Sequence, residues 1–204
     1  MRPFVKICGV TRAEDARAAI HSGATHIGCV VVEDSPRYVS VDVAKEVFDA
    51  TETATVRVLV FKNETPERIL STAAAIATRH VQVYGLGEDE ARRIEKEGMT
   101  VFRVYGIDPT ARALPPLAPK PSPKRPAVLD VGGGGSGQSF FWEILGAHAP
   151  HGVFIAGGVR PENISELMKR RPYGVDLSSG VEASPGIKDH HRLQLFFENL
   201  EKSL

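Results

Sequence analysis

Eight short apolar runs, separated by amphipathic segments, account for most of this chain. The runs cover residues 4–8, 26–32, 55–61, 80–84, 100–105, 127–131, 152–156 and 173–177. They are apolar along their length rather than alternating with polar residues, as expected for parallel strands that are covered on both faces. Parallel strands joined by helices form right-handed βαβ units, and eight such units close a barrel. The pattern therefore predicts an α/β protein of the (β/α)8 TIM-barrel class.

The length of the chain makes this a minimal barrel. A (β/α)8 barrel usually needs about 250 residues, whereas this chain has 204. We therefore expect a single domain over residues 1–204, with tight loops. The alternative is an open, doubly wound sheet, which typically carries a G-x-G-x-x-G motif after its first strand. No such motif follows residues 4–8, and the glycine-rich loops come late in the chain.

Helix-capping residues and prolines stand before several of the amphipathic segments, where they favour a helix start. The predicted helices are 12–21 after Thr11, 41–50 after Ser40, 67–78 after Thr65-Pro66, and 164–170 after residues 160–163. The segment 107–126 differs because it contains seven prolines, and proline interrupts helices. We therefore expect the fifth helix to be reduced to a turn or two near residues 110–114, followed by an extended arm.

The composition excludes several classes of partner. Basic and acidic residues balance at 25 each, so no overall positive field would attract nucleic acid or anionic lipid. No apolar run approaches the ~20 residues of a membrane span, and the histidines and cysteines show no metal-ligand spacing. The two cysteines lie in apolar runs and the first residues lack a signal-peptide pattern, which favours a cytoplasmic protein with reduced thiols. We expect no metal, nucleic acid or membrane partner.

Two predicted strand ends near the carboxyl terminus indicate a phosphate ligand. The run 152–156 is followed by Gly157-Gly158, and the run 173–177 by Ser178-Ser179-Gly180. In (β/α)8 barrels, backbone N–H groups of the seventh and eighth βα loops commonly bind phosphate, and glycine lets the backbone approach the oxygens closely. We therefore expect the other reacting groups at the carboxyl ends of the other strands.

Cys8 and Asp130 lie at two such strand ends. A cysteine in an apolar run is more often a small buried hydrophobic residue, but a thiolate at this position could act as a base if nearby cations lowered its pKa. Asp130 could cap the following turn, or burial could raise its pKa and suit it to general acid catalysis. The glycine run 132–137 that follows is only a weak phosphate motif, because it lacks the Lys-Ser/Thr of a P-loop. Cys29 lies in mid-run and is interpreted as buried.

Arg37 and Asp176 are further candidates in loops or at strand ends. Arg37 follows the second run; it could be a solvated surface residue, or its guanidinium fork could hold a substrate carboxylate in a bidentate pair. Asp176, near the end of the eighth run, could hydrogen-bond a sugar hydroxyl or simply orient its loop.

Together these segments resemble the phosphoribosylanthranilate isomerase family of tryptophan biosynthesis. The matching blocks are Val5-Lys6-Ile7-Cys8-Gly9-Val10-Thr11, Ser35-Pro36-Arg37-Tyr38-Val39-Ser40, Leu129-Asp130 with Gly134-Gly135-Ser136-Gly137, Ala156-Gly157-Gly158 with Pro161-Glu162-Asn163, and residues 171–182 with Pro185-Gly186-Ile187-Lys188-Asp189. They occur in the family's order over nearly the whole chain, and the first and last blocks are the most specific.

The resemblance implies a cofactor-free isomerase acting on N-(5-phosphoribosyl)anthranilate by an Amadori rearrangement. In this family pattern Cys8 matches the general base, Asp130 the general acid, and Arg37 the residue that holds the anthranilate carboxylate. Asp176 matches the strand-eight aspartate beside the substrate. The phosphate cradle is matched by Gly157, Gly158, Ser179 and Gly180. The implied partner is a small phosphoribosyl substrate, and the enzyme is expected to be a monomer or a homodimer.

The chain departs from the family pattern at two aromatic positions. Tyr84 stands where the family usually has a histidine after strand four, and its hydroxyl can still donate a hydrogen bond to substrate. Phe141 replaces an acidic residue at the start of helix six. Two other functions compete with the isomerase. The analogous histidine-pathway isomerase is disfavoured because it carries an aspartate on strand one, where this chain has Cys8. A non-catalytic phosphosugar-binding barrel is supported only by the two aromatic replacements.

Overall fold

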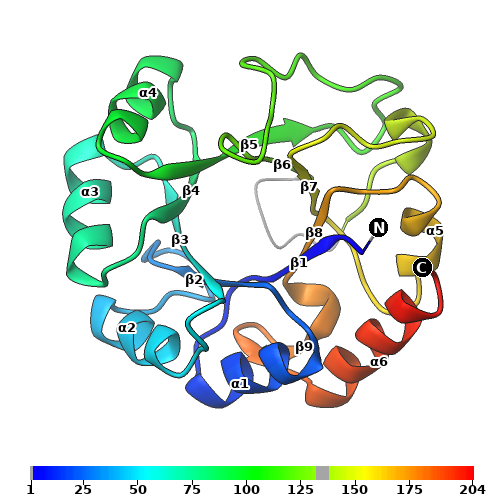
Figure 1. Cartoon of the computed structure of the whole chain (residues 1–204), viewed down its shortest axis with the longest axis horizontal. Coiled ribbons are helices and arrows are strands. Elements are labelled where there is room, and N and C mark those ends of the chain that lie inside the picture. Colours follow the sequence, from blue (N-terminus) through cyan, green and yellow to red (C-terminus); the bar gives the residue numbers. More distant parts are fainter. Residues whose placement is uncertain (1, 132–137) are drawn as a thin grey trace.

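The computed structural model describes residues 2–131 and 138–204, and its eight main strands close into the barrel expected from the sequence (Figure 1). Each strand pairs in parallel with its neighbours in chain order, and β1 pairs with β8 to complete the ring. The strands are β1 Phe4–Ile7, β2 His26–Val30, β3 Val56–Lys62, β4 His80–Tyr84, β5 Thr100–Ile107, β6 Ala127–Val131, β7 Val153–Ile155 and β8 Gly174–Leu177. The boundaries differ from the expected runs by at most two residues at each end.

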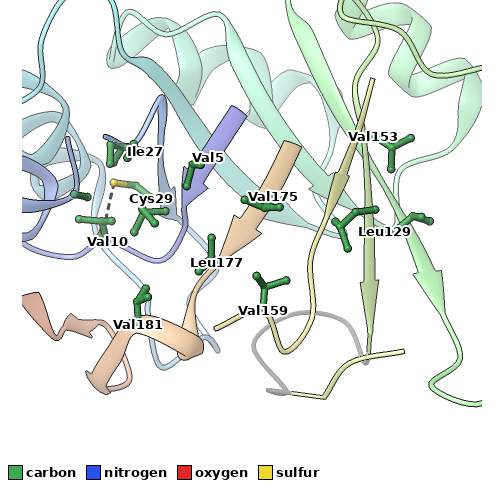
Figure 2. Packing of buried hydrophobic residues seen from close by; sticks show 14 of the residues in the cluster. Val5, Val10, Ile27, Cys29, Leu129, Val153, Val159, Val175, Leu177 and Val181 are labelled. Atoms are coloured by element: carbon green, nitrogen blue, oxygen red, sulfur yellow. Dashed lines mark hydrogen bonds between the residues drawn. The ribbon is translucent and has the colours of Figure 1, made fainter. Parts of the chain in front are cut away.

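Alternate residues of each strand face opposite sides of the barrel wall, because side chains alternate along a strand. On β6, Leu129 belongs to the large apolar cluster between the strands and the helices, whereas Val128 belongs to a smaller cluster. Figure 2 shows members of the large cluster on β1, β6, β7 and β8. The smaller cluster consists of residues from alternating strand positions: Val58, Phe102, Val128, Phe154 and Ala156. It fills the barrel interior, so the barrel has a packed core rather than a pore.

Helices surround the barrel on its outer side (Figure 1). They are α1 Ala13–Ser22, α2 Val41–Asp49, α3 Pro66–Ala75, α4 Glu88–Lys96, α5 Ile164–Met168 and α6 His190–Glu201. The expected caps Ser40 and Thr65 accept hydrogen bonds from the third residue beyond them. The expectation for Thr11 is wrong: Arg12 occupies the cap position of α1, and the Thr11 hydroxyl donates to the Gly186 carbonyl instead (2.6 Å).

The segment between β5 and β6 contains no helix (Figure 1). The expected helical turns near residues 110–114 are replaced by a single turn in which the Ala111 N–H donates to the Asp108 carbonyl. Leu114 and Leu117 pack against the main core, and the Tyr105 hydroxyl donates to the Ala118 carbonyl (2.8 Å). Proline density thus removes the fifth helix altogether, and an extended arm takes its place.

Four short elements complete the described structure. A single 3-10 turn, η1 Trp142–Leu145, stands where the sixth helix was expected to start. After β8, the turn η2 Ser179–Val181 leads into a small antiparallel pair, β9 Glu182–Ser184 and β10 Ile187–Lys188. No helix in the described part of the chain is long and apolar enough to cross a membrane.

Candidate active site

A pocket of about 780 Å³ opens at the carboxyl ends of the strands. All nine residues expected to form the site line it: Cys8, Arg37, Tyr84, Asp130, Gly157, Gly158, Asp176, Ser179 and Gly180. They come from strands or loops that are far apart in sequence, and the closed barrel brings them together. Phe141, by contrast, does not line this pocket. It is half exposed, and the Arg112 guanidinium carbon lies 4.9 Å from the centroid of the Phe141 ring. The glycine run 132–137 lies outside the described residues.

Cys8 lies just beyond β1, beside a buried ion pair inside the barrel. The Lys6 ammonium is 2.8 Å from an Asp176 carboxylate oxygen, and both side chains are buried. Burial opposes the charge on Lys6, but Asp176 and Cys8 outweigh this effect and raise the pKa of Lys6. Burial raises the pKa of the Cys8 thiol, charge and hydrogen-bonding interactions with Lys6 lower it, and the net direction is upward. Cys29 is fully buried, with its Sγ 3.4 Å from the Val10 carbonyl (Figure 2).

Asp130 lies on β6 across the pocket and is held by a side chain of β4, two strands away in the barrel. The Tyr84 hydroxyl donates to Asp130 Oδ2 at 2.8 Å, and Gln82 Nε2 donates to the same tyrosine oxygen at 3.3 Å. Burial raises the pKa of Asp130, the Tyr84 hydrogen bond lowers it, and the nearby Asp176 raises it. The net direction is upward. A buried carboxyl with a raised pKa is suited to donating a proton.

The Arg37 side chain is engaged by an acidic residue of the strand-eight loop. Its Nε and Nη2 donate to the two oxygens of Glu182 at 2.9 and 2.7 Å. The bidentate pairing that was expected with a substrate carboxylate is therefore already made with Glu182. The remaining nitrogen, Nη1, makes no hydrogen bond to the described residues. Lys188 donates to the same carboxylate (2.7 Å) and to the Cys8 carbonyl (2.6 Å). Burial would raise the pKa of Glu182, but Arg37 and Lys188 outweigh it and hold the pKa below its ordinary value.

The loops after β7 and β8 face each other at one side of the pocket. Gly157 and Gly158 have φ values of 80° and 64°, a left-handed conformation that favours glycine at both positions. The Gly158 carbonyl accepts a hydrogen bond from Asn163 Nδ2 (2.8 Å), which fixes the loop against the start of α5. Ser179 and Gly180 form the first residues of η2. The arrangement presents polypeptide backbone, rather than bulky side chains, to a ligand.

Three charged residues of the site were missed by the interpretation of the sequence. Lys6, Glu182 and Lys188 have buried side chains: Lys6 interacts with the Cys8 thiol, Lys188 donates to the Cys8 carbonyl, and Glu182 pairs with Lys188. Lys6 carried a usable signal, because a lysine inside an apolar run is rarely buried without a partner. Glu182 and Lys188 lay within the blocks that resembled the family but gave no separate indication. No cluster of potential metal ligands occurs among the residues that the structure describes.

The fold and the pocket define a (β/α)8 barrel with a thiol, a carboxyl group and buried cations at the carboxyl ends of its strands. The family model described as N-(5'phosphoribosyl)anthranilate (PRA) isomerase matches residues 5–199. A curated relative of that name from Trichlorobacter lovleyi is 35% identical and covers 98% of each chain. Another from Thermotoga maritima is 34% identical over 96% of this chain and 97% of its own. The chain belongs to the N-(5'-phosphoribosyl)anthranilate isomerase family.

Solved structures agree with this assignment. The phosphoribosyl anthranilate isomerase of Thermus thermophilus superposes with a TM-score of 0.85 and is 30% identical, with 98% of each chain covered. A structure of the isomerase in complex with reduced 1-(o-carboxyphenylamino)-1-deoxyribulose 5-phosphate has a TM-score of 0.82 at 30% identity, covering 98% of this chain and 99% of its own. A structure of monomers generated from the dimeric enzyme of Thermotoga maritima has a TM-score of 0.80 at 30% identity over 98% of each chain.

Proposed function

We propose that this protein converts N-(5'-phosphoribosyl)anthranilate to 1-(2-carboxyphenylamino)-1-deoxyribulose 5-phosphate in tryptophan biosynthesis, with Asp130 as general acid and Cys8 as general base. One observation carries the assignment of roles. Asp130 is on β6 and Cys8 follows the end of β1, and both line one pocket of about 780 Å³. A sugar placed between them can be protonated on one side and deprotonated on the other. Acid and base assistance of this kind contributes about 10²–10⁴-fold per group.

The first step opens the ribose ring. Asp130 transfers its proton to the ring oxygen, the bond from that oxygen to C1′ breaks, and the nitrogen lone pair forms a C=N bond to C1′. The product is a protonated Schiff base. The raised pKa of Asp130, caused mainly by burial, increases the fraction of the carboxyl that carries the proton. Its hydrogen bond from Tyr84 fixes the direction of the carboxyl group.

The second step moves the double bond along the sugar. The Cys8 thiolate takes the proton from C2′, and the electrons of that C–H bond form a double bond between C1′ and C2′. The electrons of the C=N bond return to nitrogen, which gives a neutral enolamine. Transfer of the hydroxyl proton of C2′ to C1′ then produces the ketone. The Cys8 thiol then releases a proton to solvent and Asp130 takes one up, so both groups are restored without any cofactor.

The remaining residues bind the substrate. Arg37 offers Nη1 to the anthranilate carboxylate, while its other nitrogens stay on Glu182. The loops containing Gly157, Gly158, Ser179 and Gly180 hold the phosphate through backbone N–H groups. Asp176 lies beside the sugar, with its Oδ1 buried and without a hydrogen-bond partner among the residues that the structure describes. Tyr84 was expected to bind substrate, and its contact with Asp130 supports an indirect contribution through the acid.

We also infer the setting in which the enzyme works. Both cysteines are free thiols, which suits a reducing cytoplasm. The whole chain would act as one domain, as a monomer or a homodimer. The dimeric relative from Thermotoga maritima supports the second possibility.

The direct test is the decay of anthranilate fluorescence when freshly made phosphoribosylanthranilate is mixed with the protein. We expect rapid decay with the wild type, and loss of at least 100-fold in kcat for Cys8→Ala and Asp130→Asn. Both variants should still bind reduced 1-(o-carboxyphenylamino)-1-deoxyribulose 5-phosphate with nearly unchanged affinity, because the phosphate loops are intact. A wild type that binds this ligand without turnover would identify a non-catalytic binding barrel. A Cys8→Ala variant that keeps most of its kcat would overturn the assignment of the base.

A further inference from the structure

Lys6 is a fully buried lysine whose charge is balanced by one carboxylate. Its ammonium lies 2.8 Å from Asp176 Oδ2, while Asp176 Oδ1 has no partner among the described residues. A buried ion pair contributes little stability on its own, because removing both charges from water costs about as much as their attraction returns. The pair is therefore a poor explanation of stability, and a function for the buried cation has to be sought in what else it reaches.

Lys6 and Cys8 converge on the same point inside the barrel. Lys6 is on β1, and Cys8 follows two residues later, just past the end of the strand, so their side chains emerge on the same side of the barrel wall. Both approach Gly28 of β2: a methyl group placed there would lie 3.0 Å from Cys8 Sγ and 3.2 Å from Lys6 Cε. Because Gly28 has no side chain, the ammonium stem and the thiol share the space above it.

The charges around Cys8 leave one positive charge in excess. The cations that interact with the thiol are Lys6, Lys188 and Arg37. The carboxylates paired with these cations are Asp176 and Glu182. The negative charge of a Cys8 thiolate would cancel this excess and make the cluster of charged groups neutral overall. A low-dielectric site favours that neutral state.

The other titratable groups that face Cys8 do not change this balance. Tyr84 and Cys29 are neutral because burial raises the pKa of each. Asp130 faces the same pocket, and burial raises its pKa, which favours its uncharged form.

We propose that Lys6 is a positioning residue that makes Cys8 a base: its ammonium stabilises the thiolate, and Asp176 keeps that ammonium beside the sulfur. The inference rests on the role proposed for Cys8 and adds the group that supplies its negative charge. Lys6 acts through the sulfur and is not assigned any contact with the substrate. Asp176 gains a second role, because it both orders the lysine and limits how strongly the lysine acts.

Two variants that break the same ion pair separate this role from a structural one. In Lys6→Met the thiolate loses its cation, so the pH midpoint of Cys8 alkylation should rise and the rate at pH 7 should fall at least tenfold. In Asp176→Asn the lysine keeps its charge and loses its competing anion, so the midpoint should fall. The probe is iodoacetamide, with labelling of the Cys8 peptide followed by mass spectrometry, and buried Cys29 serves as an internal control.

Opposite shifts in the two variants support the proposal, and equal shifts or an unchanged midpoint in Lys6→Met overturn it. Lys45→Met, which removes an exposed lysine from its pair with Asp49, should leave the midpoint unchanged. If Lys6→Met fails to fold, the double variant Lys6→Met/Asp176→Asn decides, because replacing both charges avoids an unpaired buried ion. Its midpoint should lie above that of the wild type, and a wild-type midpoint would refute the role of Lys6.

Alkylation is measured on the resting protein and needs no substrate. A protein that shows the opposite shifts without isomerising phosphoribosylanthranilate would therefore disprove the proposed function and leave the Lys6–Cys8 relationship standing. If turnover depends on Cys8 but the alkylation midpoint does not change in Lys6→Met, the proposed function stands and the role of Lys6 is disproved.

Discussion

Replacing Tyr84 by phenylalanine should shift the ionisation of Asp130 without removing the acid itself. The Tyr84 hydroxyl donates a 2.8 Å hydrogen bond to Asp130 Oδ2, and such a bond stabilises the ionised carboxylate more than the neutral acid. Loss of the bond therefore raises the pKa of Asp130. A hydrogen bond to a charged group is worth about 1.5–3 kcal/mol, which corresponds to a shift of about one to two pKa units.

The assay measures kcat/KM from fluorescence decay for wild type and Tyr84→Phe. The pH runs from about 5 to about 10, a range that covers the titration of an acid and of a thiol. We expect a bell-shaped profile in which the limb that belongs to Asp130 moves to higher pH by the calculated amount, while the Cys8 limb stays in place. Tyr105→Phe is the matched control, since its hydroxyl donates to the Ala118 carbonyl in the arm, away from the pocket. It should leave both limbs unchanged.

A Tyr84→Phe profile that superposes on the wild type would refute this reasoning. It would mean that the hydrogen bond does not control the ionisation of Asp130 in the free enzyme. Movement of the Cys8 limb instead would show that Tyr84 acts on the thiol. A large rise in KM, with both limbs of the pH profile unchanged, would indicate that Tyr84 contacts the substrate directly.

Three further outcomes are expected. Arg37→Lys should raise KM at least tenfold with a smaller change in kcat, because one ammonium cannot hold Glu182 and reach a substrate carboxylate as a guanidinium can; steady-state kinetics will show the split. Glu182→Gln should lower the free energy of unfolding in urea by about 3–5 kcal/mol, because it leaves Lys188 buried without its counter-ion. The pKa of Glu182 lies below its ordinary value of 4.5, so its contribution is present above that pH and disappears as the pH falls through the folded pKa. The stability difference between wild type and Glu182→Gln should therefore narrow below pH 4.5.

The barrel could be predicted from the sequence because its determinants are local. Each strand is a short apolar run, and Ser40 and Thr65 cap the helices that they precede. Thr11 shows where such reasoning fails, because its hydroxyl had a second partner, Gly186, that is 175 residues away in the chain. A capping side chain is predictable only when no distant acceptor competes for it.

That the nine expected residues line one pocket could also be predicted, since the carboxyl ends of barrel strands meet at one mouth. Their partners could not. The Arg37–Glu182 pair joins residues 145 positions apart, and the Tyr84–Asp130 contact joins residues 46 apart. Such pairs depend on side-chain directions across several strands, which no local pattern specifies. The sequence therefore identified an arginine fork and a tyrosine hydroxyl, and only the folded chain shows that protein carboxylates already bind them.

The arm between β5 and β6 bears on the entropy of the unfolded chain. Residues 108–126 cover this part of the barrel wall without forming a helix, and their seven prolines have φ restricted before folding begins. Ordering such a segment costs less backbone entropy than ordering a flexible loop of equal length. A stiff chain that packs Leu114 and Leu117 against the core can thus cover two parallel strands with few backbone hydrogen bonds. Much of the arm's contribution to stability then comes from the unfolded state, because the prolines reduce the number of conformations that the unfolded chain can adopt.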